Sequence, residues 1–169
     1  MAEWLWYFWM YSFLGYLLEK AFAAVTRAEN QVRRCFLWFP MCPVYGLAVL
    51  AVLALPEKFR QGGWLFLGAG VVTTVVEYAV HWAYERFLGV QFWDYSHVRG
   101  NWNGRVCLPF SLAWSVLAAF ALRFLHPLVV AAAIRIPAEV TYITLLLFSI
   151  DGIFSARLLY QTGTIACLE

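Results

Sequence analysis

Three ionisable residues, Glu77, His81 and Glu85, recur at four-residue spacing within a long apolar stretch of this 169-residue chain. That spacing places all three side chains on one face of a helix. Carboxylates and an imidazole in this arrangement can bind a cation or relay protons. A charge at the centre of a bilayer costs about 2.5–3.5 kcal/mol on insertion scales. A membrane helix with this stripe must therefore offer it to water, to other helices or to a ligand, and Glu77, midway along the stretch, is the leading candidate.

The composition indicates an integral membrane protein. Hydrophobic residues make up 63% of the chain and charged residues 13%, whereas a soluble domain averages about 45–50% apolar and about 25% charged. We expect one all-α domain over residues 1–169, a polytopic membrane helix bundle in the cell (inner) membrane. The formal net charge of +2 is too small to argue for nucleic-acid binding.

The hydrophobic pattern predicts about five transmembrane helices. They are expected near residues 4–26, 44–55, 64–88, 105–125 and 138–160. Two shorter apolar stretches, residues 35–44 and 128–136, are bounded or interrupted by proline, so we predict re-entrant or interfacial segments there. Lys and Arg are more frequent on the side of the loops at 27–34 and 89–104, which favours a cytoplasmic location for both loops.

Polar residues converge on one half of the expected bundle. In this topology Glu19, Arg105 and Asp151 lie in the same half of the bilayer as the stripe, and the loop at 89–104 is dense in hydrogen-bonding groups. We therefore predict one polar vestibule with this loop as its cover. The candidate ligand- or ion-binding residues are Glu19, Tyr45, Glu77, His81, Glu85, Asp94, Tyr95, Asn101, Arg105 and Asp151.

Most of these residues also have a structural interpretation. Glu19 could pair with Lys20 at the membrane interface, where a lysine stem can extend its charge to water. His81 could be a packed, hydrogen-bonded histidine, and Glu85 could mark a helix end. Asp151 could cap or break a helix, and the loop itself could have no role beyond its own turns.

The chain lacks several motifs of enzymes and ATPases. No P-loop pattern occurs, so any ATP hydrolysis would take place in another chain. No nucleophile motif is present, and the sequence does not identify a cofactor. The cysteines, Cys35, Cys42, Cys107 and Cys167, have no metal-site spacing and are interpreted as small apolar side chains. A disulfide from Cys107 to Cys35 or to Cys42 would require that their loops meet.

Three stretches together resemble a known family. They are residues 12–19, which end at Glu19; residues 39–46, with Pro43, Tyr45 and Gly46; and residues 77–114, with Glu77, Trp93, Asp94, Tyr95, Ser96, Gly104 and Arg105. The pattern resembles the ABC-transporter type IV permease family of CmpB-like small multipass membrane proteins. This resemblance implies a membrane fold, a transport activity and a separate ATPase partner.

Three functions remain open. The first is a transporter or permease-type subunit, whose carboxylates bind a cation or, together with Arg105, a zwitterionic solute. The second is an intramembrane enzyme that acts on a lipid or isoprenoid headgroup. Its acid–base groups or metal ligands would be Glu77, His81, Glu85, Asp94 and Tyr95. The third is a non-catalytic scaffold whose polar residues only lock helices together. We favour the transporter over the enzyme and the scaffold. The expected partners are the lipid bilayer, an ATPase or other membrane subunit, and a second copy of the chain.

Overall fold

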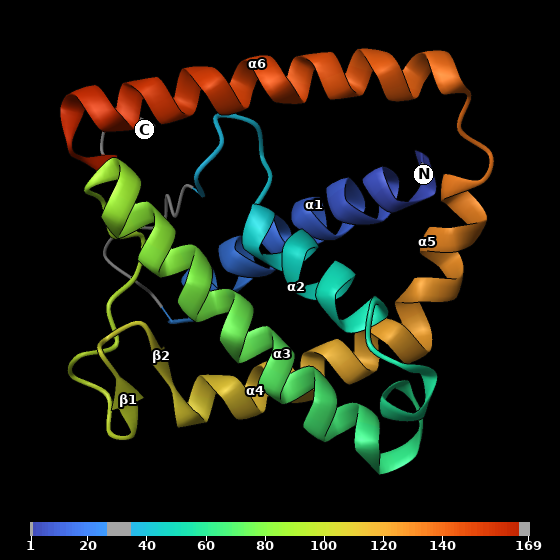
Figure 1. Ribbon diagram of the computed structural model, residues 1–169, viewed down its shortest axis with the longest axis horizontal. Coiled ribbons are helices and arrows are strands. Elements are labelled where there is room, and N and C mark those ends of the chain that lie inside the picture. The colour runs from blue at the N-terminus through green and yellow to red at the C-terminus, as the bar shows by residue number, and fades with distance from the viewer. Residues whose placement is uncertain (1, 27–34, 166–169) are drawn as a thin grey trace.

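The computed structural model, which describes residues 2–26 and 35–165, is a helical bundle (Figure 1). Its helices are α1 (Ala2–Thr26), α2 (Pro43–Leu53), α3 (Gly62–Ala83), α4 (Leu108–Phe120), α5 (His126–Ala133) and α6 (Ala138–Thr162). A 3-10 helix η1 (Glu57–Arg60) precedes α3, and the π-helical turns η2 (Tyr84–Leu88) and η3 (Ala121–Leu125) extend α3 and α4. Strands β1 (Asn101–Trp102) and β2 (Val106–Cys107) pair antiparallel in the loop after α3. The all-α prediction is confirmed, whereas the loop at 27–34 with its arginines, and Cys167, lie outside the described residues.

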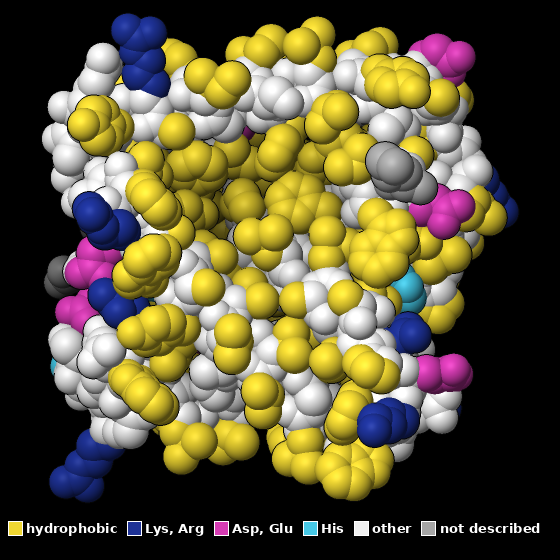
Figure 2. Space-filling model, in the orientation of Figure 1, with side chains coloured by type: hydrophobic (Ala, Val, Ile, Leu, Met, Phe, Trp, Pro, Cys, Tyr) yellow, Lys and Arg dark blue, Asp and Glu magenta, His cyan; other side chains and the backbone are white. Residues whose placement is uncertain are grey.

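Three helices are long and apolar enough to cross a membrane. They are Gly62–Leu88, Leu108–Ala133 and Ala138–Thr162, with 27, 26 and 25 residues. At a rise of 1.5 Å per residue, Gly62–Leu88 and Ala138–Thr162 each exceed the roughly 30 Å of a bilayer's hydrocarbon core. The face seen in Figure 2 is covered mainly by hydrophobic side chains, and its charged side chains gather near opposite margins. Both observations fit a bundle whose sides face lipid and whose ends face water.

The end of the fourth helix differs from the prediction in its secondary structure. The proline at 127 suggests a separate interfacial turn over residues 128–136, and the structure has a helix, α5, that follows α4 and η3 without a break. Pro127 lies in the first turn of α5, where a backbone N–H would have no acceptor within that helix, so its absence costs little stability. The π-helical turn before α5 accommodates the change in the backbone hydrogen-bond pattern. α5 then turns across the end of the bundle (Figure 1), where Val129 and Tyr7 of α1 share a buried cluster.

α2 is too short to cross the membrane. Its 11 residues rise about 16 Å. Residues 36–41, just before it, are not helical and extend to α6 (Figure 1). Backbone N–H groups at membrane depth need internal partners. Asp151 of α6, which is 7% exposed, accepts the N–H groups of Trp38 and Phe39 at 3.2 and 3.1 Å. Asp151 therefore has a structural reason to lie inside an apolar helix, because it accepts hydrogen bonds from the non-helical segment.

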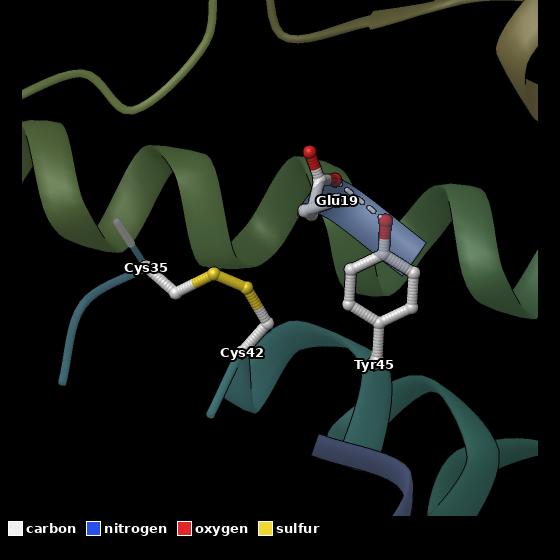
Figure 3. The surroundings of a disulfide bond; sticks show 4 residues. All are labelled: Glu19, Cys35, Cys42 and Tyr45. Atoms are coloured by element: carbon white, nitrogen blue, oxygen red, sulfur yellow. Dashed lines mark hydrogen bonds between the residues drawn. A yellow bond between two sulfur atoms is a disulfide. The ribbon is translucent and has the colours of Figure 1, made fainter. Parts of the chain in front are cut away.

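A disulfide closes this non-helical segment. Cys35 and Cys42 are bonded, with their Cα atoms 5.0 Å apart (Figure 3). Cys42 also donates its N–H to the Ser12 carbonyl oxygen at 2.8 Å, which ties the start of α2 to α1. The alternatives that join Cys107 to either partner are wrong, because Cys107 is free and buried in β2, beyond α3 in the chain.

Two glycines allow α1 and α2 to approach closely. A Cβ at Gly46 would overlap the Ser12 hydroxyl, and one at Gly15 would overlap the Tyr45 ring. Small residues at such contacts are typical of packed membrane helices. The glycines therefore let Tyr45 pack against α1.

Replacement of Gly46 with Ala is expected to lower the melting temperature of the detergent-solubilised protein. The added methyl group overpacks the contact with α1, which costs about 1–3 kcal/mol. Gly63→Ala is the control, because a Cβ there meets no atom within 4 Å. Thermal unfolding followed by tryptophan fluorescence measures both variants. Equal melting temperatures for Gly46→Ala and the wild type would contradict the close packing of α1 and α2.

Replacement of Asp151 with Ala is expected to destabilise the protein by about 1–3 kcal/mol, because the Phe39 N–H loses its acceptor inside the apolar bundle. Limited proteolysis should also cut residues 36–41 faster. Glu139→Ala, an exposed position on the same helix, is the control and should leave both measurements unchanged. Proteolysis of that segment at the wild-type rate in Asp151→Ala would show that this carboxylate does not hold it.

Candidate functional site

A cavity of about 650 Å³ lies among α1, α2, α3, α4 and the loop after α3. Its wall is mainly apolar. Four of the predicted site residues line it: Glu19 from α1, Tyr45 from α2, Glu77 from α3 and Tyr95 from the loop. Small-molecule sites typically have volumes of about 300–1,000 Å³ and a few polar groups in an apolar wall. The cavity therefore has the size and lining of a ligand site.

Two tyrosine–glutamate pairs form the polar part of the cavity. The Tyr45 hydroxyl donates to Glu19 Oε1 at 2.6 Å (Figure 3), and the Tyr95 hydroxyl donates to Glu77 Oε1 at 3.1 Å. The pairs are close enough for the Glu19 charge to act on both Glu77 and Tyr95. Burial raises the pKa of the Tyr95 phenol, and the Glu77 charge raises it further. Tyr95 therefore keeps its proton and remains a donor at neutral pH.

One oxygen of Glu77 is buried without a well-aligned hydrogen bond from the described residues. The residue is 6% exposed, and Oε1 accepts the bond from Tyr95. The Trp114 indole lies beside the carboxylate, but Oε2 has no well-aligned hydrogen bond from any residue that the structure describes. A buried polar atom without a partner costs about 1–3 kcal/mol. This oxygen is therefore suited to a donor or a cation that enters the cavity.

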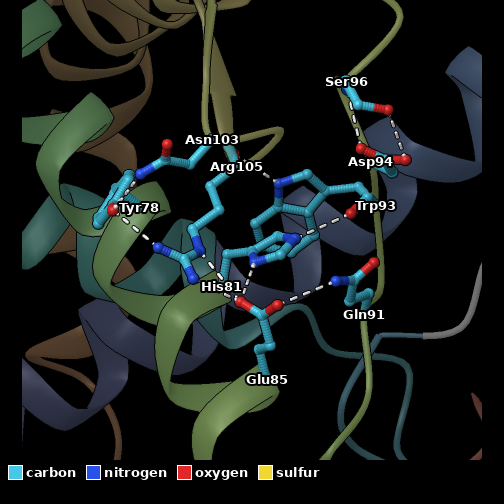
Figure 4. A network of polar contacts seen from close by, with 9 residues as sticks. All are labelled: Tyr78, His81, Glu85, Gln91, Trp93, Asp94, Ser96, Asn103 and Arg105. Atoms are coloured by element: carbon cyan, nitrogen blue, oxygen red, sulfur yellow. Dashed lines mark hydrogen bonds and ion pairs between the residues drawn. The ribbon is translucent and has the colours of Figure 1, made fainter.

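His81 has a different role, because its side chain extends from α3 and hydrogen-bonds the backbone of the loop after α3. It is 3% exposed, and its Nε2 lies 2.9 Å from the carbonyl oxygen of Trp93 (Figure 4). Since a carbonyl oxygen only accepts, Nε2 carries the proton. The Trp93 indole in turn donates to the carbonyl oxygen of Arg105 at 2.9 Å. These bonds connect α3 to both ends of the loop.

Glu85 is occupied by Arg105. Nε and Nη2 of the guanidinium both donate to Glu85 Oε2, at 3.1 and 2.6 Å, and Nη1 donates to the Tyr78 hydroxyl at 2.7 Å (Figure 4). The hydrogen bonds to Glu85 raise the pKa of the Arg105 guanidinium, which stays charged. Arg105 does not line the cavity. The geometry therefore gives no support to a zwitterion held between Arg105 and the cavity carboxylates.

Asp94 and Asn101 shape the loop itself. Asp94 accepts the backbone N–H and the hydroxyl of Ser96, both at 2.8 Å. These bonds, the backbone N–H first, lower the pKa of the Asp94 carboxyl, so the turn keeps its charged acceptor at neutral pH. Asn101 donates to the Val98 carbonyl oxygen at 2.8 Å and accepts the Gly104 N–H at 3.1 Å. Such bonds are typical of turns.

The predicted vestibule thus divides into two sets of residues. Glu19, Tyr45, Glu77 and Tyr95 share the cavity, whereas His81, Glu85, Asp94, Asn101, Arg105 and Asp151 hold the segments around it. The prediction omitted Trp114, which lines the cavity, and Tyr78, which binds Arg105. The seven-residue spacing of Tyr78 and Glu85, two turns of one helix face, could have indicated the second.

Comparison with known proteins identifies a family for this chain. A family model described as "Putative ABC-transporter type IV" matches residues 6–156. No curated protein matches the chain, and no solved structure matches it. The matched region contains the cavity carboxylates and the whole loop after α3.

Replacement of Arg105 with Gln is expected to speed hydrogen–deuterium exchange of the backbone amides in residues 89–107, because the ion pair with Glu85 is lost. Glu85→Gln should have a similar effect, and the double variant should add little, since both remove one interaction.

Arg99→Gln serves as the control, because Arg99 is an exposed residue of the same loop. Exchange at the wild-type rate in both single variants, or fully additive effects in the double variant, would show that the pair does not anchor the loop.

Proposed function

Because this chain belongs to the ABC-transporter type IV family, we propose that it is a transporter or permease-type subunit that binds a small solute or ion in the cavity between α1 and α4. The observation that carries this proposal is a cavity of about 650 Å³, lined by Glu19 and Glu77, within an apolar bundle. Ionisable groups inside membrane segments are costly and commonly mark the path of an ion or a solute.

The non-helical segment before the short helix α2 supports the proposal. Discontinuous helices recur at the solute sites of membrane transporters, where helix ends and unwound backbone face the substrate. Pro43 and Tyr45, in the first turn of α2, line the cavity, as do Cys35 and Phe36 from the non-helical stretch before it. Irregular backbone at membrane depth is tolerated where it is buried in protein or lines a cavity.

The energy source, in this proposal, is a second protein. The chain has no P-loop, so an ATPase subunit of the same transporter would hydrolyse the nucleotide. We place the chain in the cell membrane as a multipass subunit with five crossings. α1, and α2 together with the segment before it, add two crossings to the three apolar helices.

The loop after α3 would act as the cover of the site. Tyr95 belongs to this loop, and its hydroxyl reaches Glu77 inside the cavity. Movement of the loop would therefore change the hydrogen bonding of the buried carboxylate, which couples access to binding. The contacts that His81 and Glu85 make with Trp93 and Arg105 would hold this loop in position on α3.

Proteoliposomes that contain the protein, alone and with its co-purified ATPase, should take up at least one labelled solute from a panel of cations, anions, zwitterions and neutral molecules. Glu77→Gln is expected to lower this uptake about tenfold or more, because a charged contact worth about 1.5–3 kcal/mol is lost.

Glu139→Gln, at an exposed position on α6, is the matched control and should transport normally. Two results would contradict the proposal: protein-dependent uptake of no solute in the panel, or uptake that is unchanged in a folded Glu77→Gln protein. A loss of folding without a separable loss of uptake would instead indicate a scaffold.

A further inference from the structure

The Cys35–Cys42 disulfide lies in the wall of the cavity. Both cysteines line the cavity, and so does Phe36, which follows Cys35. Cys35 is partly exposed, whereas Cys42 is 3% exposed. Figure 3 shows the bond near Tyr45, whose hydroxyl donates to Glu19 inside the cavity. A change in this bond would therefore alter the surface that a solute in the cavity contacts.

The disulfide lies near one end of the helical bundle. Phe36 stacks on Tyr84 with ring centroids 5.4 Å apart. Tyr84 begins η2, the last turn of the third apolar helix, and the loop after α3 leaves the bundle from this end. A water-soluble thiol can thus approach Cys35 from the aqueous side of this end.

The charge distribution favours a cytoplasmic location for this end. Lys and Arg are more frequent here than at the opposite end, and Arg33 and Arg34 directly precede Cys35 in the sequence. Basic residues in short loops favour the cytoplasmic side of a membrane. Thiols in the cytoplasm are kept reduced, and the disulfides that form there are usually transient, catalytic or redox-sensing. A disulfide on this side of the membrane is therefore expected to be reversible.

The position of Cys42 favours opening of the bond. Cys42 is the N-cap of α2, a helix of 11 residues. The positive end of a helix dipole stabilises an anion, and a thiolate at a helix N-terminus benefits in this way. The Cys42 N–H also donates to the Ser12 carbonyl oxygen at 2.8 Å, which holds the residue against α1 without the disulfide. Cys42 is thus suited to be the sulfur that leaves as a thiolate.

From these observations we propose that Cys35 and Cys42 form a reversible thiol–disulfide pair. This pair is a redox-modification site whose oxidation state sets how firmly residues 36–41 are held beside the cavity. The inference goes beyond the proposed function, because it concerns control of the cavity wall and its test requires no transport.

Glutathione, a small water-soluble thiol, supplies the electrons. Its thiolate attacks the sulfur of Cys35, the Sγ–Sγ bond breaks, and Cys42 leaves as a thiolate that takes a proton from water. A second glutathione thiolate attacks the glutathione sulfur of the mixed disulfide, and the released Cys35 thiolate is protonated in turn. Two electrons and two protons thus pass to the cysteine pair, and oxidised glutathione is the product. The reverse sequence closes the bond.

Hydrogen bonds alone hold the segment in the reduced form. Asp151 accepts the N–H groups of Trp38 and Phe39, and these bonds do not involve the disulfide. Loss of a cross-link increases the conformational freedom of the chain that it closes. The reduced protein should therefore open the segment at 36–41 more often than the oxidised protein does.

Redox titration of the wild-type protein in lipid nanodiscs tests reversibility. The protein is equilibrated with glutathione mixtures that range from fully oxidised to fully reduced. Free thiols are then alkylated, and peptide mapping by mass spectrometry separates Cys35 and Cys42 from the other cysteines. We expect the pair to change from disulfide to two thiols within this range. A pair that stays bonded in excess reduced glutathione, or that never bonds, overturns the inference.

Labelling in cells that express the protein tests the compartment. Rapid alkylation should find both cysteines as thiols during normal growth and as a disulfide after brief treatment with diamide, a thiol oxidant. A membrane-impermeant maleimide should label Cys35 in reduced inverted vesicles and not in reduced intact cells. A disulfide that persists during normal growth, or labelling from outside the cell, would show a permanent bond in an oxidising compartment and sink the proposal.

Hydrogen–deuterium exchange tests the effect on the cavity wall. Dithiothreitol should speed exchange of the amides in residues 36–42 about tenfold or more, because the cross-link is lost. Cys35→Ser should exchange at this faster rate with or without dithiothreitol. Cys107→Ser, which removes a free and buried thiol, is the control and should respond to dithiothreitol as the wild type does. Equal exchange in the oxidised and reduced wild type would contradict control of the wall by this bond.

Discussion

The need to satisfy polar groups within an apolar bundle determines how the loop after α3 folds. Glu77, His81 and Glu85 lie along one face of this helix, and lipid offers them no partners. The loop supplies one partner to each: the Tyr95 hydroxyl, the Trp93 carbonyl oxygen and the Arg105 guanidinium. Because the three acceptors and donors lie one helical turn apart, the loop must follow α3 closely. The three polar residues of α3 therefore depend on the loop for hydrogen-bond partners, and the loop depends on them for its position.

The two carboxylates on this face of α3 differ in how many of their oxygens accept hydrogen bonds. Both oxygens of Glu85 are bonded, one to Arg105 and the other to Gln91. Glu77, on the same helix face, has one oxygen bonded and the other buried without a well-aligned donor among the described residues. A buried charge that stays incompletely paired costs stability, and the cost is recovered when a ligand completes the pairing. This difference moves the centre of the site from the visible stripe to the cavity around Glu77.

The same requirement explains why α2 can be short. A non-helical stretch before it exposes backbone N–H groups at membrane depth, and Asp151 accepts two of them. The Cys35–Cys42 disulfide closes this stretch, and Gly46 lets α2 pack closely against α1. As a result Tyr45 reaches Glu19, so the irregular segment contributes directly to the cavity.

Composition and local spacing were sufficient to predict the membrane class, the approximate helix positions and the placement of Glu77, His81 and Glu85 on one face, because each of these depends on residues close together in the chain. They did not predict which partner each polar group would find. Asp151 binds a backbone N–H 113 residues away, and Cys35 pairs with Cys42 rather than with Cys107. Pro127 lies in the first turn of a new helix, α5, which begins directly after the π-helical turn η3. Contacts between distant elements depend on how the helices pack, and that packing alone separated the residues of the cavity from those that only hold the loop.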